Sequence, residues 1–123
     1  MLVAFATESQ KFVDAHFGLA SAFSVYDVTA EEIHAKGTVY CPKEFTPDED
    51  KIEGRLQIIS DCAVVYCTAI GGPAAARLVQ SNIHPLKVSE GTPIEDELNR
   101  LQTLLAGSPP PWLRKRLQQE KNN

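Results

Sequence analysis

The chain has 123 residues, 43% of them hydrophobic and 23% charged, which is ordinary for one globular domain. The formal net charge of −4 argues against a nucleic-acid partner and against binding to an anionic membrane. The charge is uneven, because residues 1–107 carry 8 basic and 15 acidic side chains, whereas residues 108–123 carry 4 basic and 1 acidic. The sequence therefore predicts an acidic domain over 1–107 and a basic helical tail over 108–123 that the fold does not need.

The opening segment and the cysteines predict a cytoplasmic protein. No run approaches the roughly 18–20 apolar residues that span a bilayer. The segment MLVAFATESQ lacks the basic region that begins a signal peptide. The three cysteines include no Cys-x-x-Cys pair, which argues against a disulfide framework and a zinc finger. We expect a reduced compartment and no membrane partner.

Three short segments in the first half of the chain predict strands. Residues 2–7 are a continuous apolar run that suits a buried strand. Residues 22–28 alternate in character, and residues 32–40 become rich in β-branched side chains near their end. We expect these last two strands to pair as a hairpin, followed by a loop over 40–50.

Two helices are predicted to begin at the same motif, Thr-Pro-x-Glu, at Thr46 and again at Thr92. In each, the threonine is expected to cap the helix, the proline to take the first turn and the glutamate to complete a capping box. Apolar side chains follow at helical spacing: Ile52, Leu56 and Ile59 after the first motif, and Ile94, Leu98, Leu101 and Leu105 after the second. Replacing either cap with alanine is expected to cost about 1 kcal/mol.

Two further strands alternate with these helices. They are residues 62–67 and residues 84–89, separated by a glycine-rich turn that leads into an alanine-rich helix. This alternation predicts parallel strands joined by right-handed crossovers. With the first three strands, it predicts a three-layer α/β/α domain around a mixed sheet of about five strands.

The predicted topology places a site at one edge of the sheet. If strands 2–7 and 62–67 are parallel neighbours, the loop that contains His16 and the turn that contains Gly71 and Gly72 lie side by side. Ligands of open α/β sheets bind at this carboxyl edge. The turn opens a helix whose free N–H groups favour an anion, although it is no P-loop. The alternative is that the glycines let the helix pack closely on the sheet.

The three histidines differ in their predicted surroundings. His34 lies on an edge strand among charged residues, which indicates a solvated side chain. His84 precedes a proline and is interpreted as a connector. His16, in a loop between a small residue and an aromatic one, is either a turn residue or a functional group.

The cysteines offer one candidate ligand. Cys62 and Cys67 are expected on opposite faces of one strand, too far apart to share a metal ion. Cys62 is interpreted as a small buried hydrophobe. Cys67, at the carboxyl end of the strand, could reach a ligand or could be a packed thiol. Cys41, in a loop, is expected to be exposed.

Catalysis finds little support in the sequence. There is no G-x-S-x-G elbow, and the acidic clusters at 48–53 and 95–97 lie in first turns of helices, where the helix dipole explains them. The first strand contains no aspartate, which argues against a nuclease of the mixed-sheet type. We expect no enzyme activity.

Several segments in order resemble the nitrogenase iron–molybdenum cofactor biosynthesis and carrier family. They are VDAHFG, FSVYDV, DCAVVYCTAIGGPAAARLV, HPLKVSEGTPIEDELNRLQ and GSPPPWLRKRLQ, and the resemblance as a whole covers about residues 2–118. The resemblance implies a ribonuclease-H-like fold without nuclease activity. It implies binding and transfer of an iron–sulfur precursor, such as the NifB cofactor, or of the iron–molybdenum cofactor. The CPKEF segment departs from the family pattern, so the resemblance does not choose between the molybdenum and vanadium systems.

The resemblance points to His16 for cluster binding and to Cys67 at the matching cysteine position, both as metal contacts. The implied cofactor-binding residues are His16, Phe17, Gly18, Cys67, Gly71 and Gly72. A neutral imidazole is a good iron ligand, and attachment through one or two ligands rather than a four-cysteine cage suits a cargo that must be released. Nearby cations expected to offset the cluster charge are Lys11, Lys43 and Arg77.

The implied partners are assembly proteins that donate and accept the cluster, with the chain a monomer or weak dimer. One alternative is an interaction module that docks through its basic tail and binds no cluster. A weaker alternative is a small hydrolase. Iron content separates the carrier from the interaction module.

Overall fold

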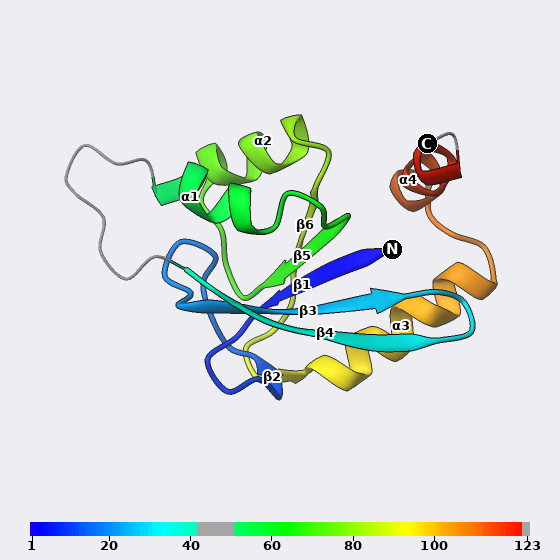
Figure 1. The fold of residues 1–123 in the computed structure, drawn as a ribbon, viewed down its shortest axis with the longest axis horizontal. Coiled ribbons are helices and arrows are strands. Elements are labelled where there is room, and N and C mark those ends of the chain that lie inside the picture. The colour runs from blue at the N-terminus through cyan, green and yellow to red at the C-terminus, as the bar shows by residue number, and fades with distance from the viewer. Residues whose placement is uncertain (42–50, 122–123) are drawn as a thin grey trace.

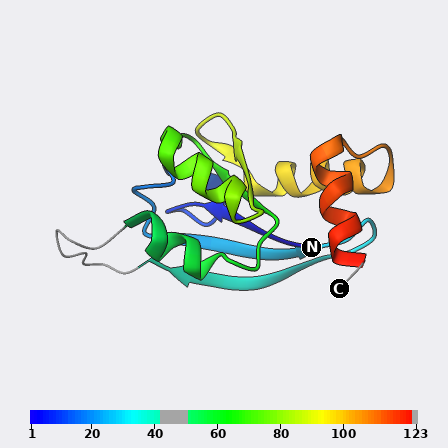
Figure 2. The ribbon, with the colours of Figure 1, turned by 90° about the horizontal axis from the view of Figure 1, so that it is seen from above.

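The computed structural model describes residues 1–41 and 51–121, in which a five-stranded sheet is covered by helices on both faces (Figures 1 and 2). The strands are β1 (Leu2–Ala6), β2 (Phe12–Val13), β3 (Ala22–Val28), β4 (Ile33–Tyr40), β5 (Val64–Cys67), β6 (His84–Lys87) and β7 (Thr92–Pro93). The helices are α1 (Lys51–Ile58), α2 (Gly72–Gln80), α3 (Ile94–Ala106) and α4 (Pro111–Lys121).

The order of the main sheet is β4-β3-β1-β5-β6. Strand β3 pairs antiparallel with both β1 and β4, whereas β5 pairs parallel with both β1 and β6. Strand β3 therefore runs against the other four strands. The predicted three-layer α/β domain with a mixed five-stranded sheet is confirmed, and the strand order is that of the expected ribonuclease-H-like topology.

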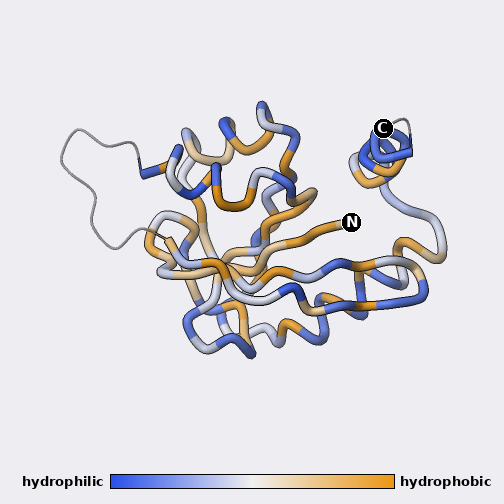
Figure 3. Tube along the Cα trace, viewed as in Figure 1, coloured by the Kyte–Doolittle hydropathy of each residue, from blue (hydrophilic) through white to orange (hydrophobic). Residues whose placement is uncertain are grey.

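Strand β1 is buried from both sides, which explains its continuous apolar sequence. Val3 and Phe5 belong to one hydrophobic cluster, and Ala4 and Ala6 belong to another on the opposite face. Figure 3 shows the resulting apolar colour along β1 and the polar colour over most of α4. The sheet thus separates two cores, one under α1 and α2 and the other over α3.

Amphipathic helices close both cores, as their spacing predicts. Leu56 and Ile59 pack into the first core, and Ile94, Leu98 and Leu101 pack into the second. Each of these five side chains is at most 7% exposed. The predicted cap of the first helix, Thr46, lies outside the described residues.

The predicted helix cap at Thr92 is wrong. Thr92 belongs to β7, the residue at the cap position of α3 is Pro93, and no side chain caps that helix. The Thr92 hydroxyl donates instead to the Ser89 carbonyl at 2.6 Å. The reason is a two-stranded sheet of β2 and β7 that the sequence did not reveal.

The small β2–β7 sheet anchors the segment that leads to His16. Val13 pairs with Thr92, the Gly91 N–H donates to the Val13 carbonyl, and the Ile94 N–H donates to the Lys11 carbonyl, both at 2.9 Å. The start of α3 therefore holds the chain between β1 and His16 in place.

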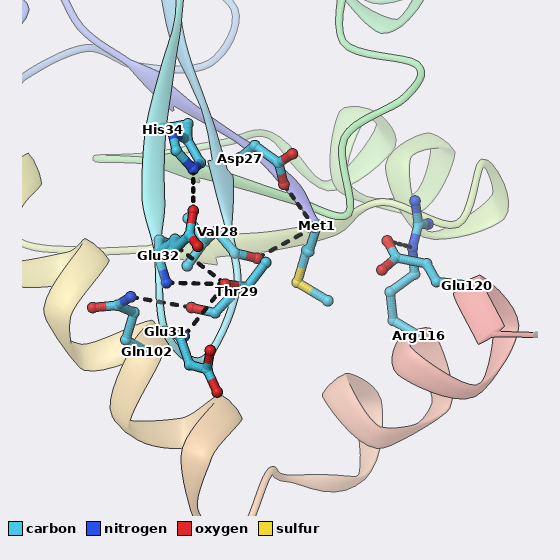
Figure 4. A network of polar contacts seen from close by, with 10 residues as sticks. All are labelled: Met1, Asp27, Val28, Thr29, Glu31, Glu32, His34, Gln102, Arg116 and Glu120. Atoms are coloured by element: carbon cyan, nitrogen blue, oxygen red, sulfur yellow. Dashed lines mark hydrogen bonds and ion pairs between the residues drawn. The ribbon is translucent and has the colours of Figure 1, made fainter.

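The predicted β3–β4 hairpin is confirmed (Figure 4). The Thr29 hydroxyl accepts the N–H of Glu32 at 2.9 Å, and the Thr29 N–H donates to the Glu32 carbonyl at the same distance. Beside it, the Met1 amino group donates to the Asp27 carboxylate at 2.9 Å. That hydrogen bond is the main reason why the pKa of Asp27 lies below its ordinary value of 3.8.

Helix α4 packs against the second core through the buried Leu113 and the partly buried Trp112 and Leu117. Leu113 is fully buried, and Trp112 stacks on His84 with 3.8 Å between ring centroids. Arg116 donates to the Asn82 carbonyl at 2.6 Å. The tail is helical as expected, but its burial of Leu113 leads us to expect that the fold needs it. The division of the domain at residue 107 stays a prediction.

We predict that Leu113→Ala destabilises the protein by about 2–5 kcal/mol, because it empties a buried site and leaves a cavity. Leu19→Ala serves as the control, since Leu19 is 79% exposed. That change should alter stability by no more than about 0.5 kcal/mol. Urea unfolding followed by circular dichroism measures both. Equal stability of wild type and Leu113→Ala would show that the tail is dispensable after all.

We predict that stability falls as the pH drops below 6.5 and that His84 contributes to this loss. Burial lowers the pKa of His84 from its ordinary value of 6.5, so the unfolded chain takes up the proton at higher pH than the native protein. Acidification therefore favours the unfolded state. His84→Gln should flatten the pH dependence of the unfolding free energy below 6.5. Urea unfolding of wild type and His84→Gln at several pH values measures this dependence, and equal dependence in the two proteins would contradict the assignment to His84.

Candidate functional site

The loop after β1 and the turn after β5 lie side by side, as predicted. The Phe17 N–H donates to the Ala69 carbonyl at 2.9 Å, and the Thr68 N–H donates to the Ala15 carbonyl at 3.0 Å. These two bonds continue the parallel pairing of β1 with β5 beyond the ends of the strands. They fix His16 at the carboxyl edge of the sheet.

A pocket of about 220 Å³ opens at this edge, between the His16 loop, the start of α2 and α1. It is lined by His16, Phe17, Gly18, Lys51, Ile52, Arg55, Gly71, Pro73 and Ala74. Four of the six residues that the resemblance implied are therefore brought together. Gly72 and Cys67 do not line the pocket.

The His16 ring is oriented by its own loop. Its Nδ1 accepts the N–H of Gly18 at 2.9 Å, and its carbonyl accepts the N–H groups of Leu19 and Ala20. A neutral imidazole that accepts at Nδ1 carries its proton at Nε2. The arrangement therefore assigns Nε2–H as a hydrogen-bond donor on a half-buried side chain.

Phe17 and Gly18 support this loop in different ways. Phe17 is fully buried and packs on Phe23 with 5.8 Å between ring centroids, so it anchors the loop. Gly18 has no positive φ, so a tight turn does not explain the glycine. A Cβ at this position would instead meet His16 Nδ1 and Cε1 at 3.4 Å. The missing side chain leaves room for the imidazole.

Close packing does not explain Gly71 or Gly72. A Cβ at Gly72 would meet nothing within 4 Å, and a Cβ at Gly71 would meet only the Pro73 ring, at 4.0 Å. Neither residue has a positive φ. Gly71 is the cap of α2, with no side-chain hydrogen bond to the helix end. The first N–H groups of the helix are thus left without a side-chain cap beside the pocket.

The three cysteines are all buried as free thiols. Burial raises the pKa of Cys67 to about 11 and that of Cys62 to about 12. The two belong to the same hydrophobic cluster, so the expected opposite faces are wrong, because Cys62 precedes β5. Cys41 is 5% exposed, so its expected exposure is also wrong. Its N–H donates to the Ser21 carbonyl at 2.8 Å.

The cations beside the pocket differ from the expected ones. Lys51 and Arg55, on α1, line it, and Arg55 is 6% exposed and donates to the Ala20 carbonyl at 3.0 Å. Arg77 forms an ion pair with Glu53, and Lys11 does not line the pocket. Lys43 lies outside the described residues. In the sequence, only the four-residue spacing of Lys51 and Arg55 indicated that their side chains lie on the same face of a helix.

The site is not a metal cage within the described part of the chain. Over residues 1–41 and 51–121, no three His, Cys, Asp or Glu side chains gather to hold a metal ion. His34 is exposed and pairs with Glu32 at 2.6 Å, as its position predicts. His84 is part of the α4 interface rather than a mere connector.

Comparison with known proteins identifies the family. The profile of the dinitrogenase iron-molybdenum cofactor family matches residues 1–104. This chain belongs to that family. Protein NifX of Herbaspirillum seropedicae is 42% identical over 96% of this chain and 82% of that protein. Protein NifX of Sinorhizobium fredii is 40% identical over 95% of this chain and 78% of that protein.

A solved structure shares the fold of this family member. The apo form of the orange protein of Desulfovibrio gigas superposes with a TM-score of 0.65 at 20% identity, covering 85% of this chain and 88% of that one. At that identity the likeness concerns the fold alone. In the described part of the chain, no helix is both long and apolar enough to cross a membrane.

We predict that Gly72→Ala stabilises this family member by about 0.4–1 kcal/mol, because the new methyl group meets open space and the unfolded chain loses freedom. Gly37→Ala is the matched control. Gly37 has a φ of +108°, which strains any L side chain, so that change should destabilise the protein. Urea unfolding measures both variants. Destabilisation by Gly72→Ala would restore the close-packing explanation of the turn.

Proposed function

We propose that this chain is a carrier that binds an anionic iron–sulfur precursor of the nitrogenase cofactor and hands it on during cofactor assembly. The observation that carries the proposal is the pocket that joins His16, the uncapped start of α2 at Gly71, and Arg55. Membership of the dinitrogenase iron-molybdenum cofactor family and the relatives named NifX support it. The proposed cargo is the NifB cofactor or a related intermediate.

The electrostatics of the pocket suit an anionic cargo. The N-terminus of α2 directs positive partial charge toward the Gly71 turn, and no acidic residue lies in the first turn of that helix. Among the described residues that line the pocket, Lys51 and Arg55 are basic and none is an aspartate or glutamate. These described groups favour an anion even though the overall charge is −4.

In this proposal, His16 contacts the cargo through Nε2. With Nδ1 accepting the Gly18 N–H, the neutral ring presents an Nε2–H that donates to a sulfide or another anionic atom of the cluster. Ligation of iron through Nε2 requires that proton to leave. If it moved to Nδ1, that atom would face the Gly18 N–H as a second donor. We therefore favour a hydrogen bond from His16 over an iron–nitrogen bond.

In this proposal, Cys67 belongs to the core on which the pocket lies and does not bind the cargo. It is fully buried, and its raised pKa keeps the thiol protonated at neutral pH. Binding iron as a thiolate would require loss of that proton and movement of the turn after β5. An attachment by charge and hydrogen bonds, without a cage of ligands, lets a partner with stronger ligands remove the cargo.

We predict that His16→Ala weakens cluster retention about tenfold to a hundredfold, as expected for a lost charge-assisted hydrogen bond. His16→Gln should retain most of the affinity, because its amide N–H lies near the position of Nε2 and glutamine is a poor iron ligand. Cys67→Ala should retain the cluster. The measurement is an anaerobic titration with isolated NifB cofactor, followed by iron quantitation after desalting.

Melting temperatures of the same variants control for folding. His16→Gln and His16→Ala could lose equal amounts of iron while both keep the melting temperature of wild type. In that case His16 is an iron ligand and the hydrogen-bond assignment is wrong. Equal iron retention by wild type and His16→Ala would remove His16 from the site and shift the assignment to Cys67. If no variant, wild type included, retains iron, the chain is an interaction module and the carrier proposal fails.

A further inference from the structure

The three walls of the His16 pocket are held in place in different ways. The His16 loop and the turn before α2 are joined by two backbone hydrogen bonds, at Phe17 and at Thr68. Among the described residues, no backbone hydrogen bond joins α1 to either of these walls. Helix α1 has 8 residues and includes Gly54, so it is too short and too weakly helical to be stable in isolation. Its position beside the pocket therefore depends on its side chains.

Two polar side chains of α1 reach the other two walls. Arg55, which is 6% exposed, donates to the Ala20 carbonyl at the end of the His16 loop, at 3.0 Å. Glu53 accepts a hydrogen bond from Arg77 of α2, with 2.5 Å between Glu53 Oε2 and Arg77 Nη2. Helix α1 is thus linked to the His16 loop by one side chain and to α2 by another.

The Glu53–Arg77 ion pair lies next to the pocket, between α1 and α2, which cover the same face of the sheet (Figures 1 and 2). Glu53 follows Ile52, which lines the pocket, and Arg77 lies one turn after Pro73 and Ala74, which line it from α2. A smaller pocket, of about 150 Å³, lies near the other ends of the two helices. It is lined by Glu53, Leu56, Gln57, Ser60 and Ser81. Because space remains between the helices on both sides of the ion pair, apolar packing alone does not fix their separation.

We propose that the Glu53–Arg77 ion pair positions α1 against α2, so that Ile52 and Arg55 stay in place around the cargo. This inference rests on the carrier function proposed above. The ion pair is neutral as a whole, so it affects the shape of the site more than its charge. The side chains of Glu53 and Arg77 are 50% and 31% exposed, and so exposed a pair adds little to the stability of the whole fold.

Single substitutions separate an effect on position from an effect on charge. Glu53→Ala removes a negative charge beside the pocket, whereas Arg77→Met removes a positive charge and keeps an apolar stem. If the two residues acted only through their charges, Glu53→Ala would strengthen the binding of an anionic cluster and Arg77→Met would weaken it. Because both changes break the link to α2, we expect both to weaken binding of NifB cofactor by about twofold to fivefold, the range of an exposed ion pair.

An exchanged pair tests the link itself. The double variant Glu53→Arg with Arg77→Glu keeps both charges and can form the same ion pair with its polarity reversed. We expect it to regain most of the affinity that either reversal loses alone. The matched controls are Glu95→Ala and Arg114→Met, at exposed positions of α3 and α4, and they should bind the cluster like wild type.

A measurement without the cluster keeps this inference separate from the carrier function. Cys41, Cys62 and Cys67 are free thiols buried in the core beneath α1 and α2. The rate at which dithionitrobenzoate modifies them in the native protein reports how often this core opens. We expect Glu53→Ala and Arg77→Met to raise that rate about twofold or more, with melting temperatures close to that of wild type. The exchanged pair should restore the slow rate.

Three results would overturn the inference. Tighter cluster binding by Glu53→Ala together with weaker binding by Arg77→Met would show that the two residues act through charge alone. An exchanged pair that binds no better than the single reversals would show that the link does not matter. Thiol rates equal to that of wild type in both single variants would show that the ion pair does not hold α1. If wild type itself retains no iron, the carrier proposal fails, and the thiol rates still decide whether the ion pair holds α1.

Discussion

The parallel pairing of β1 with β5 is the constraint on which the rest of this structure depends. Its three residue pairs, Val3 with Val64, Ala4 with Val65 and Phe5 with Tyr66, lie at the centre of the sheet and are buried on both faces. Because the strands are parallel, the chain leaves both at the same edge. The two loops that follow must therefore meet, and the hydrogen bonds between them continue the ladder. The His16 pocket exists because this pairing exists.

The alternation of side chains along β5 distributes its residues between the two cores. Val65 and Cys67 face the core beneath α1 and α2, under the His16 pocket. Tyr66 faces the other core, where its ring stacks on Phe5 with 4.4 Å between ring centroids. One four-residue strand thus contributes to both cores. A shift of one residue in its register would exchange these roles.

The five strands of the main sheet could be predicted because apolar runs and helical spacing are local signals, whereas their order followed from the family resemblance. Features that depend on partners distant in the chain could not. Thr92 has every local mark of a helix cap, but pairing with Val13 places it in a strand. Leu113 is one apolar anchor within a basic segment, so composition pointed away from the core in which it is buried. Arg55 faces the site only because of how α1 sits over the His16 loop.

The proposed carrier role also explains why His16 is held by its own loop. A histidine fixed through Nδ1 by the next residue but one is oriented before any cargo arrives, so binding costs little side-chain entropy. The same bond keeps the proton on Nε2 and so disfavours a direct bond to iron, which would be slow to break. The backbone N–H of Gly18 is the donor, and the absence of a side chain there leaves room for the ring. In this proposal, the hydrogen bond that orients the imidazole also keeps the bond between His16 and the cluster weak. A carrier needs the fixed orientation to bind its cargo and the weak bond to release it.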